Sequence, residues 1–170
     1  MRRKVMKRLL VVMFFAASAF AQKPPPGLPA ACGPENVGFK VKLDKSQPAL
    51  VQSAAAGKAR VYFIGEDFNL VIRIGLDGRW VGANENDSYF SVSVEPGEHH
   101  LCASADFIGG QPMRLLHLTA QAGSVYYISA REVYTRDGVY LFFGAEDSDQ
   151  AAYEIATFPL SVSTPKTPKK

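Results

Sequence analysis

The chain has 170 residues, 47% of them hydrophobic and 21% charged, which fits one globular domain with tails and excludes a disordered or collagen-like chain. The formal charge of +3 comes from the first residues, because removing residues 1–21 leaves 14 basic and 16 acidic side chains. A nucleic-acid-binding protein needs a basic patch on its folded domain. We therefore expect no nucleic-acid partner.

Residues 1–21 have the organisation of a signal peptide. Five basic residues precede an apolar run at 9–20, and an A-x-A pattern at 19–21 matches a signal peptidase site. The two arginines at 2–3 loosely match a twin-arginine signal, but the short basic region and the strongly hydrophobic run favour export of an unfolded chain. We therefore expect an exported protein, periplasmic or extracellular, whose mature chain begins at Gln22.

Residues 22–36 are rich in Pro and Ala and are expected to form an extended arm. The arm contains Cys32, and the other cysteine of the chain is Cys102. An exported protein with an even number of cysteines most simply pairs them, so we predict a disulfide that ties the arm to the body. Residues 29–32 also match a lipoprotein cleavage site, which would make Cys32 a lipidated first residue. The prolines at 24–26 separate that site from the apolar run and favour the disulfide.

Residues 37–160 form the predicted folded body, and their apolar residues recur with the period of two that is typical of half-buried strands. The chain after the signal peptide has no run of about 20 apolar residues, the length of a membrane-spanning helix, so we expect a soluble mature protein without an integral membrane span. Eight segments have the strand pattern: 37–43, 59–64, 69–74, 89–94, 98–104, 113–120, 124–131 and 138–143.

Short connections separate these segments. Asp77-Gly78 and Asp137-Gly138 are dipeptides that accept positive φ at both turn centres, so each is expected to close a tight hairpin. Pro96-Gly97 favours a type II turn, and Gly109-Gly110 and Ala122-Gly123 mark two more reversals. Connections this short join antiparallel strands. About eight strands in a body of this length predict an all-β fold, an antiparallel two-layer β-sandwich.

The end of the body departs from the strand pattern. Four acidic or capping residues at 146–149 precede a helical segment at 150–156, and Pro159 follows it. We predict a short C-terminal helix with Ser148 or Asp149 as its N-cap. The acidic residues lack the D-x-D-x-D-G order of a calcium loop. Residues 161–170, rich in Ser, Thr, Pro and Lys, are predicted to be a disordered tail.

Five segments carry a family resemblance: residues 57–64, 76–82 with the Asp77-Gly78 turn, 88–90, 96–101 with the Pro96-Gly97 turn, and 122–127. In this order they resemble the bacterial family known as domain of unknown function 2846, over about residues 57–144. The middle of this region is also similar to PEGA-type modules. The resemblance implies an exported or lipoprotein β-domain of the cell envelope, and it implies no catalytic residues.

Motifs of the common enzyme classes are absent from the sequence. It has no G-x-S-x-G elbow, no H-E-x-x-H and no glycine-rich phosphate loop, so we predict a protein that is not an enzyme and has no cofactor. His99 and His100 follow each other on one strand and point to opposite faces. Only one of them can approach His117, and a third ligand would have to come from elsewhere, so we predict no metal site.

Aromatic residues remain as candidates for a contact surface. We expect Trp80 and Tyr89 to contact a ligand or partner, because exposed aromatic rings stack on sugars or anchor protein interfaces. Trp80 could equally belong to the core. Further tyrosines are spread over the predicted strands: Tyr62, Tyr126, Tyr127, Tyr134 and Tyr140.

The predicted function is an exported, non-catalytic binding or structural module of the bacterial cell envelope, with an envelope protein or a glycan as partner. The alternative is a carbohydrate-binding module that uses exposed aromatic residues.

Overall fold

The computed structural model describes residues 32–33, 37–46, 51–66, 70–105 and 113–166. These residues form ten strands and one ten-residue helix, α2 (Ser148–Thr157). The strands are β1 (Phe39–Asp44), β2 (Ala59–Glu66), β3 (Val71–Leu76), β4 (Arg79–Glu85), β5 (Ser88–Val94), β6 (Gly97–Ala105), β7 (Met113–Ala120), β8 (Val125–Thr135), β9 (Gly138–Ala145) and β10 (Leu160–Pro165). The predicted signal peptide, most of the predicted arm and the Gly109-Gly110 turn lie outside the described residues.

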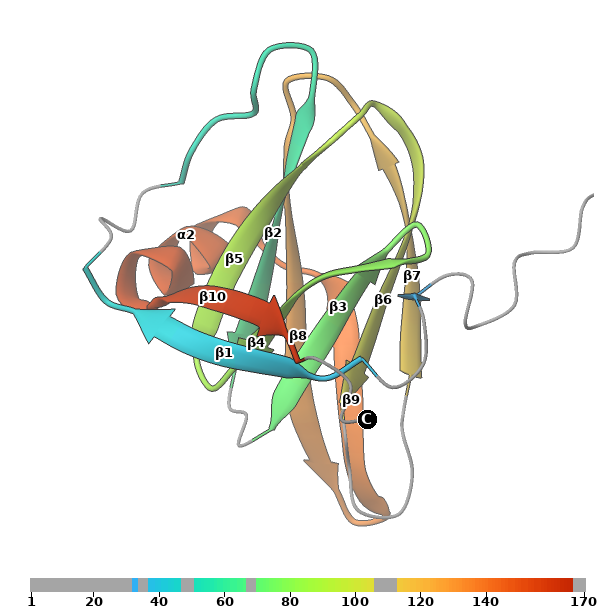
Figure 1. Ribbon diagram of the computed structural model, residues 1–170, viewed down its shortest axis with the longest axis vertical. Coiled ribbons are helices and arrows are strands. Elements are labelled where there is room, and N and C mark those ends of the chain that lie inside the picture. The colour runs from blue at the N-terminus through green and yellow to red at the C-terminus, as the bar shows by residue number, and fades with distance from the viewer. Residues whose placement is uncertain (1–31, 34–36, 47–50, 67–69, 106–112, 167–170) are drawn as a thin grey trace, which may run out of the picture.

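The strands form two sheets that pack face to face (Figure 1). The six-stranded sheet has the order β1-β10-β5-β2-β8-β9, and the four-stranded sheet has the order β4-β3-β6-β7. The predicted all-β sandwich with a C-terminal helix is therefore confirmed. Most neighbouring strands are antiparallel, but two pairs are parallel: β10 with β5, and β2 with β8. The parallel strands β2 and β8 form the longer of these two pairings. They can be parallel because the chain passes through the whole four-stranded sheet between them.

Strand β10 occupies residues for which the sequence predicted a disordered tail. It pairs antiparallel with β1 from Asp44↔Leu160 to Phe39↔Pro165. The prolines and lysines near the C-terminus obscured the short alternation of apolar residues and serines in this segment. The serines have a structural role, because Ser161 donates a hydrogen bond to the Ala83 carbonyl (2.6 Å) and Ser163 accepts one from the Ala83 N–H (3.0 Å). Strand β10 thus ties the edge of the four-stranded sheet to the six-stranded sheet.

The two hairpins predicted at Asp-Gly dipeptides both form. Asp77 and Gly78 both have positive φ, 49° and 79°, as a tight hairpin between β3 and β4 requires. The predicted tight hairpin between β8 and β9 also forms, with Thr135 paired to Gly138. Of Asp137 and Gly138 only Gly138 has positive φ, so the positive φ expected at Asp137 is wrong. The Thr135 side chain stabilises this turn instead, since its hydroxyl donates to the Gly138 carbonyl (3.1 Å) and accepts from the Asp137 N–H (3.2 Å).

Each face of the six-stranded sheet carries an apolar cluster. The main core lies between the two sheets, around Phe63, Ile74 and Leu101. A second apolar cluster lies on the outer face of the six-stranded sheet, where α2 packs Ala151 and Ile155 on its side chains. The sheet contributes Tyr62, Ile64 and Tyr89 to this second cluster.

The N-cap of helix α2 lies one residue before the nearer of the two predicted caps. Its N-cap is Asp147, whose Oδ1 accepts hydrogen bonds from the Asp149 N–H (2.9 Å) and the Gln150 N–H (3.2 Å). Predicting Ser148 or Asp149 as the cap was wrong because Asp147 offers the same capping chemistry at the neighbouring position. Among the described residues, no helix is both long and apolar enough to cross a membrane.

Candidate functional site

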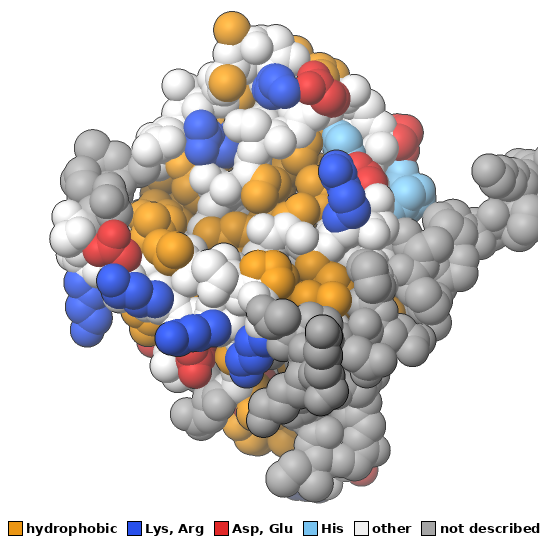
Figure 2. Space-filling model, in the orientation of Figure 1, with side chains coloured by type: hydrophobic (Ala, Val, Ile, Leu, Met, Phe, Trp, Pro, Cys, Tyr) orange, Lys and Arg blue, Asp and Glu red, His pale blue; other side chains and the backbone are white. Residues whose placement is uncertain are grey.

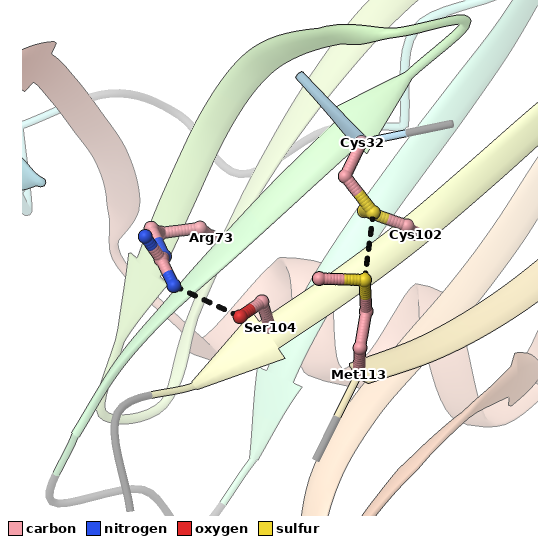
Figure 3. Close-up of a disulfide and its surroundings, with 5 residues drawn as sticks. All are labelled: Cys32, Arg73, Cys102, Ser104 and Met113. Atoms are coloured by element: carbon pink, nitrogen blue, oxygen red, sulfur yellow. Dashed lines mark hydrogen bonds between the residues drawn. A yellow bond between two sulfur atoms is a disulfide. The ribbon is translucent and has the colours of Figure 1, made fainter. Parts of the chain in front are cut away.

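The predicted disulfide is present on the outer face of the four-stranded sheet. Cys32 and Cys102 are bonded, with 5.4 Å between their Cα atoms, and both side chains are buried. Cys32 lies over Gly75 of β3, where a Cβ atom would come within 2.4 Å of the Cys32 carbonyl oxygen. Figure 3 shows the Met113 sulfur next to the bond, 3.3 Å from Cys32 Sγ. Because a disulfide has no S–H group, this is a packing contact between sulfurs.

Trp80 lies on the same face, half-buried beneath the arm. A Cβ atom on Gly33 would lie 2.9 Å from Trp80 Cδ1, and the Arg73 guanidinium stands 5.1 Å from the centre of the ring. The ring therefore belongs neither to the core between the sheets nor to an open surface. Both sequence interpretations of Trp80 miss this third arrangement, because it depends on where Cys32 and Gly33 lie on the sheet.

Arg73 links the segment before β1 to the four-stranded sheet. Its guanidinium donates hydrogen bonds to the Val37 carbonyl (3.1 Å) and to Ser104 Oγ (2.9 Å), the second of which Figure 3 shows. The planar guanidinium therefore contacts three segments at once, at Val37, Ser104 and Trp80. The surroundings of Trp80 are thus occupied by the chain's own segments.

Tyr89, the second candidate contact residue, lies on the opposite side of the molecule and is only 6% exposed. Its ring centre is 6.3 Å from that of Tyr62, in the cluster that α2 covers. Burial, together with the neighbouring Tyr62, raises the pKa of Tyr89. This position does not support a contact role, because a ligand would have to displace the helix to reach the ring.

The three histidines are divided between the two faces of the four-stranded sheet. As the strand period predicts, His99 and His100 point to opposite faces, and His100 pairs with His117 across β6 and β7, with ring centres 5.4 Å apart. His117 Nε2 contacts the Glu98 carboxylate. Figure 2 shows histidine side chains, in pale blue, beside acidic side chains, in red, at one edge of the molecule. No group of three His, Cys, Asp or Glu side chains in the described part of the chain is arranged to hold a metal ion.

His99 fastens the hairpin turn that precedes Trp80. Its Nδ1 lies 2.7 Å from Asp77 Oδ2, and its Nε2 lies 2.7 Å from the Glu95 carbonyl oxygen. Only the imidazolium form can donate to both acceptors. Burial by itself lowers the pKa of His99, but the hydrogen bond to the Glu95 carbonyl and the hydrogen bond and charge of Asp77 together raise it above its ordinary value.

This contact makes the stability of the fold depend on pH. Since the pKa of His99 is raised in the folded protein, its stabilising contribution is complete below the unfolded pKa and is lost as pH rises through the folded pKa. We expect about 1 kcal/mol, because the partner carboxylate of Asp77 is partly exposed. Urea unfolding of the parent and of His99→Gln, from mildly acidic to mildly alkaline pH, measures the difference. A constant difference across this range would contradict the assignment.

The exposed apolar residues of the β8–β9 hairpin gather near its turn. Val133, Tyr134, Val139 and Tyr140, which we call the hairpin end, are 37%, 67%, 41% and 41% exposed. Val133 pairs with Tyr140, and Tyr134 pairs with Val139, so each face of the hairpin carries one valine and one tyrosine. Figure 1 shows the hairpin extending to the lower end of the molecule.

Sequence reasoning placed Tyr134 and Tyr140 on strands but did not predict their exposure. A strand pair with one solvated face normally has polar residues on that face. The uncharged run of β9, from Gly138 to Ala145, is the available sequence signal, since it lacks such an alternation. The structure adds the finding that exposed apolar residues lie on both faces of the hairpin end.

A scan against protein-family models finds no match for this chain, and neither does a search of curated proteins. The resemblance to the domain of unknown function 2846 family therefore stays a prediction.

Proposed function

We propose that the protein is an exported, non-catalytic binding module of the bacterial cell envelope, and that the hairpin end binds a protein partner. The observation that carries the proposal is the exposure of four apolar side chains on both faces of one hairpin. Burying a valine or a large aromatic side chain contributes about 1.5–3 kcal/mol relative to leaving it in water. A partner that encloses the hairpin end would gain this contribution from several residues at once.

The composition of the hairpin end favours a protein as partner. Tyrosines are enriched among the residues that dominate binding energy at protein interfaces, and polar residues surround such centres. Glu132, Arg136 and Asp137 lie next to the four apolar residues and supply polar groups of both signs. This arrangement of an apolar centre with a polar rim supports docking to another protein.

Two further observations support the export and the non-catalytic role. The disulfide uses both cysteines of the chain, and such bonds persist in oxidising compartments outside the cytoplasm. The described groups with shifted pKa values take part in contacts within the fold: Asp77 with His99, Tyr89 and Tyr127 with Tyr62, and Glu154 with Gln150.

Replacing the tyrosines of the hairpin end tests the proposal. The double variant Tyr134→Ser and Tyr140→Ser is expected to lose about 2 kcal/mol or more of partner binding, as centres of protein interfaces do. Its free energy of unfolding should change by no more than about 0.5 kcal/mol per site, since both rings are exposed. Quantitative capture of envelope proteins by immobilised parent and variant measures the loss.

Leu115→Ser is the matched control, because Leu115 is 52% exposed and lies on β7 rather than on the hairpin. It should capture the same proteins as the parent. Equal capture by the parent and the hairpin variant would refute the proposed surface. Retention of a polysaccharide alone would favour the alternative function, a carbohydrate-binding module.

A further inference from the structure

We propose a second binding site, separate from the hairpin end: a groove at the end of α2 that takes a sugar ring of an envelope saccharide. The groove has a volume of about 500 Å³, within the range of small-molecule sites, about 300–1,000 Å³. Three parts of the chain line it. They are Lys45 after β1, Asn86 and Asp87 in the β4–β5 turn, and Tyr153 and Phe158 at the end of α2. Figure 1 shows α2 and the end of β1 on the same side of the molecule.

The chemistry of the groove matches the two-sided character of a sugar ring. A pyranose has an apolar face of C–H groups and a rim of hydroxyl groups. The exposed ring of Tyr153 offers an aromatic surface to the apolar face. The hydroxyls need both donors and acceptors, and the lining contains an amide (Asn86), a carboxylate (Asp87) and an ammonium group (Lys45).

Other ligand classes fit this groove less well. A phosphate or a nucleotide would meet the Asp87 carboxylate, and among the described residues that line the groove Lys45 is the single cation. A lipid chain needs an enclosed apolar cavity, whereas this groove is open and carries charged side chains. A saccharide is the class that uses an aromatic surface together with an amide and charges of both signs.

The walls of the groove are held in place by the fold. Asn86 has positive φ (54°) in a turn where Ser88 Oγ accepts from the Glu85 N–H (3.3 Å). The Tyr89 N–H donates to the Pro159 carbonyl (3.2 Å), so the strand that follows this turn is bonded to the segment that follows the helix. A site formed before the ligand arrives loses little conformational freedom on binding.

NMR titration of the labelled protein tests the groove directly. The probes are chitotriose, maltotriose and the peptidoglycan disaccharide of N-acetylglucosamine and N-acetylmuramic acid, each at millimolar concentration. At least one is expected to shift the backbone signals of Asn86, Asp87 and residues 153–158. Tyr153→Ala should weaken its binding about tenfold through loss of the aromatic surface, whereas Tyr153→Phe should bind nearly as the parent does.

Leu115→Ala is the control, because Leu115 lies on β7 outside the groove lining, and it should bind the saccharide as the parent does. The proposal is overturned if none of the three probes shifts the groove signals, or if Tyr153→Ala binds as tightly as the parent. Protein capture depends on Tyr134 and Tyr140, whereas saccharide binding depends on Tyr153. The loss of one proposed site would therefore be seen in one of these two measurements and not in the other.

Discussion

Removing the disulfide is expected to lower the free energy of unfolding by about 4 kcal/mol. The bond joins residues 70 positions apart, and closing a loop of this length restricts the unfolded chain by about that amount. The variant Cys32→Ala with Cys102→Ala leaves no free thiol, because the chain has two cysteines. Urea unfolding of the variant and of the parent measures the change.

The same variant reports on the arm. Trp80 is the sole tryptophan of the chain and lies beneath Gly33, so release of the arm should expose the ring and shift its fluorescence to longer wavelength. Leu115→Ala is the matched control, since Leu115 is 52% exposed and lies opposite Cys102 on β7. It should change neither reading. Parent-like stability and fluorescence in the double alanine variant would contradict the described packing of the arm.

Tyr62→Ala is expected to destabilise the protein by about 3–5 kcal/mol, the usual cost of deleting a buried aromatic ring. The Tyr62 side chain is 2% exposed and stacks on Tyr127, with ring centres 5.8 Å apart. It lies in the cluster that joins α2 to the six-stranded sheet. Thermal or urea unfolding measures the loss.

Tyr62→Phe separates the ring from its hydroxyl. The hydroxyl accepts a hydrogen bond from the Gln52 N–H (2.7 Å), so this variant should lose only about 1 kcal/mol. If Tyr62→Ala cost no more than Tyr62→Phe, the second apolar cluster would not stabilise the fold.

Local patterns made much of this fold predictable. The period of two located β7 at residues 113–120 without error, because alternation along one strand depends only on which face is buried. Asp77-Gly78 forms its turn as predicted, since positive φ at both positions is a local requirement. The cysteine pair followed from export and an even count.

Features that depend on distant segments were not predictable in the same way. Tyr89 is buried because a helix about 60 residues further along the chain covers it. Trp80 is half-buried because Gly33 lies against its ring, and β10 forms because β1 offers a full-length partner. The exposure of the hairpin end was not predictable either. Apolar residues on both faces of a strand pair ordinarily predict that distant segments bury both faces, and at the hairpin end they do not.

Photo-crosslinking in bacterial cells that express the protein is the most direct test of the proposed function. A photoreactive phenylalanine analogue would replace Tyr140 in one sample and Val162 of β10, 44% exposed and outside the hairpin, in another. The account predicts a discrete adduct with an envelope protein from position 140 and none from position 162. No adduct from position 140, or the same adducts from both positions, would contradict a contact surface at the hairpin end.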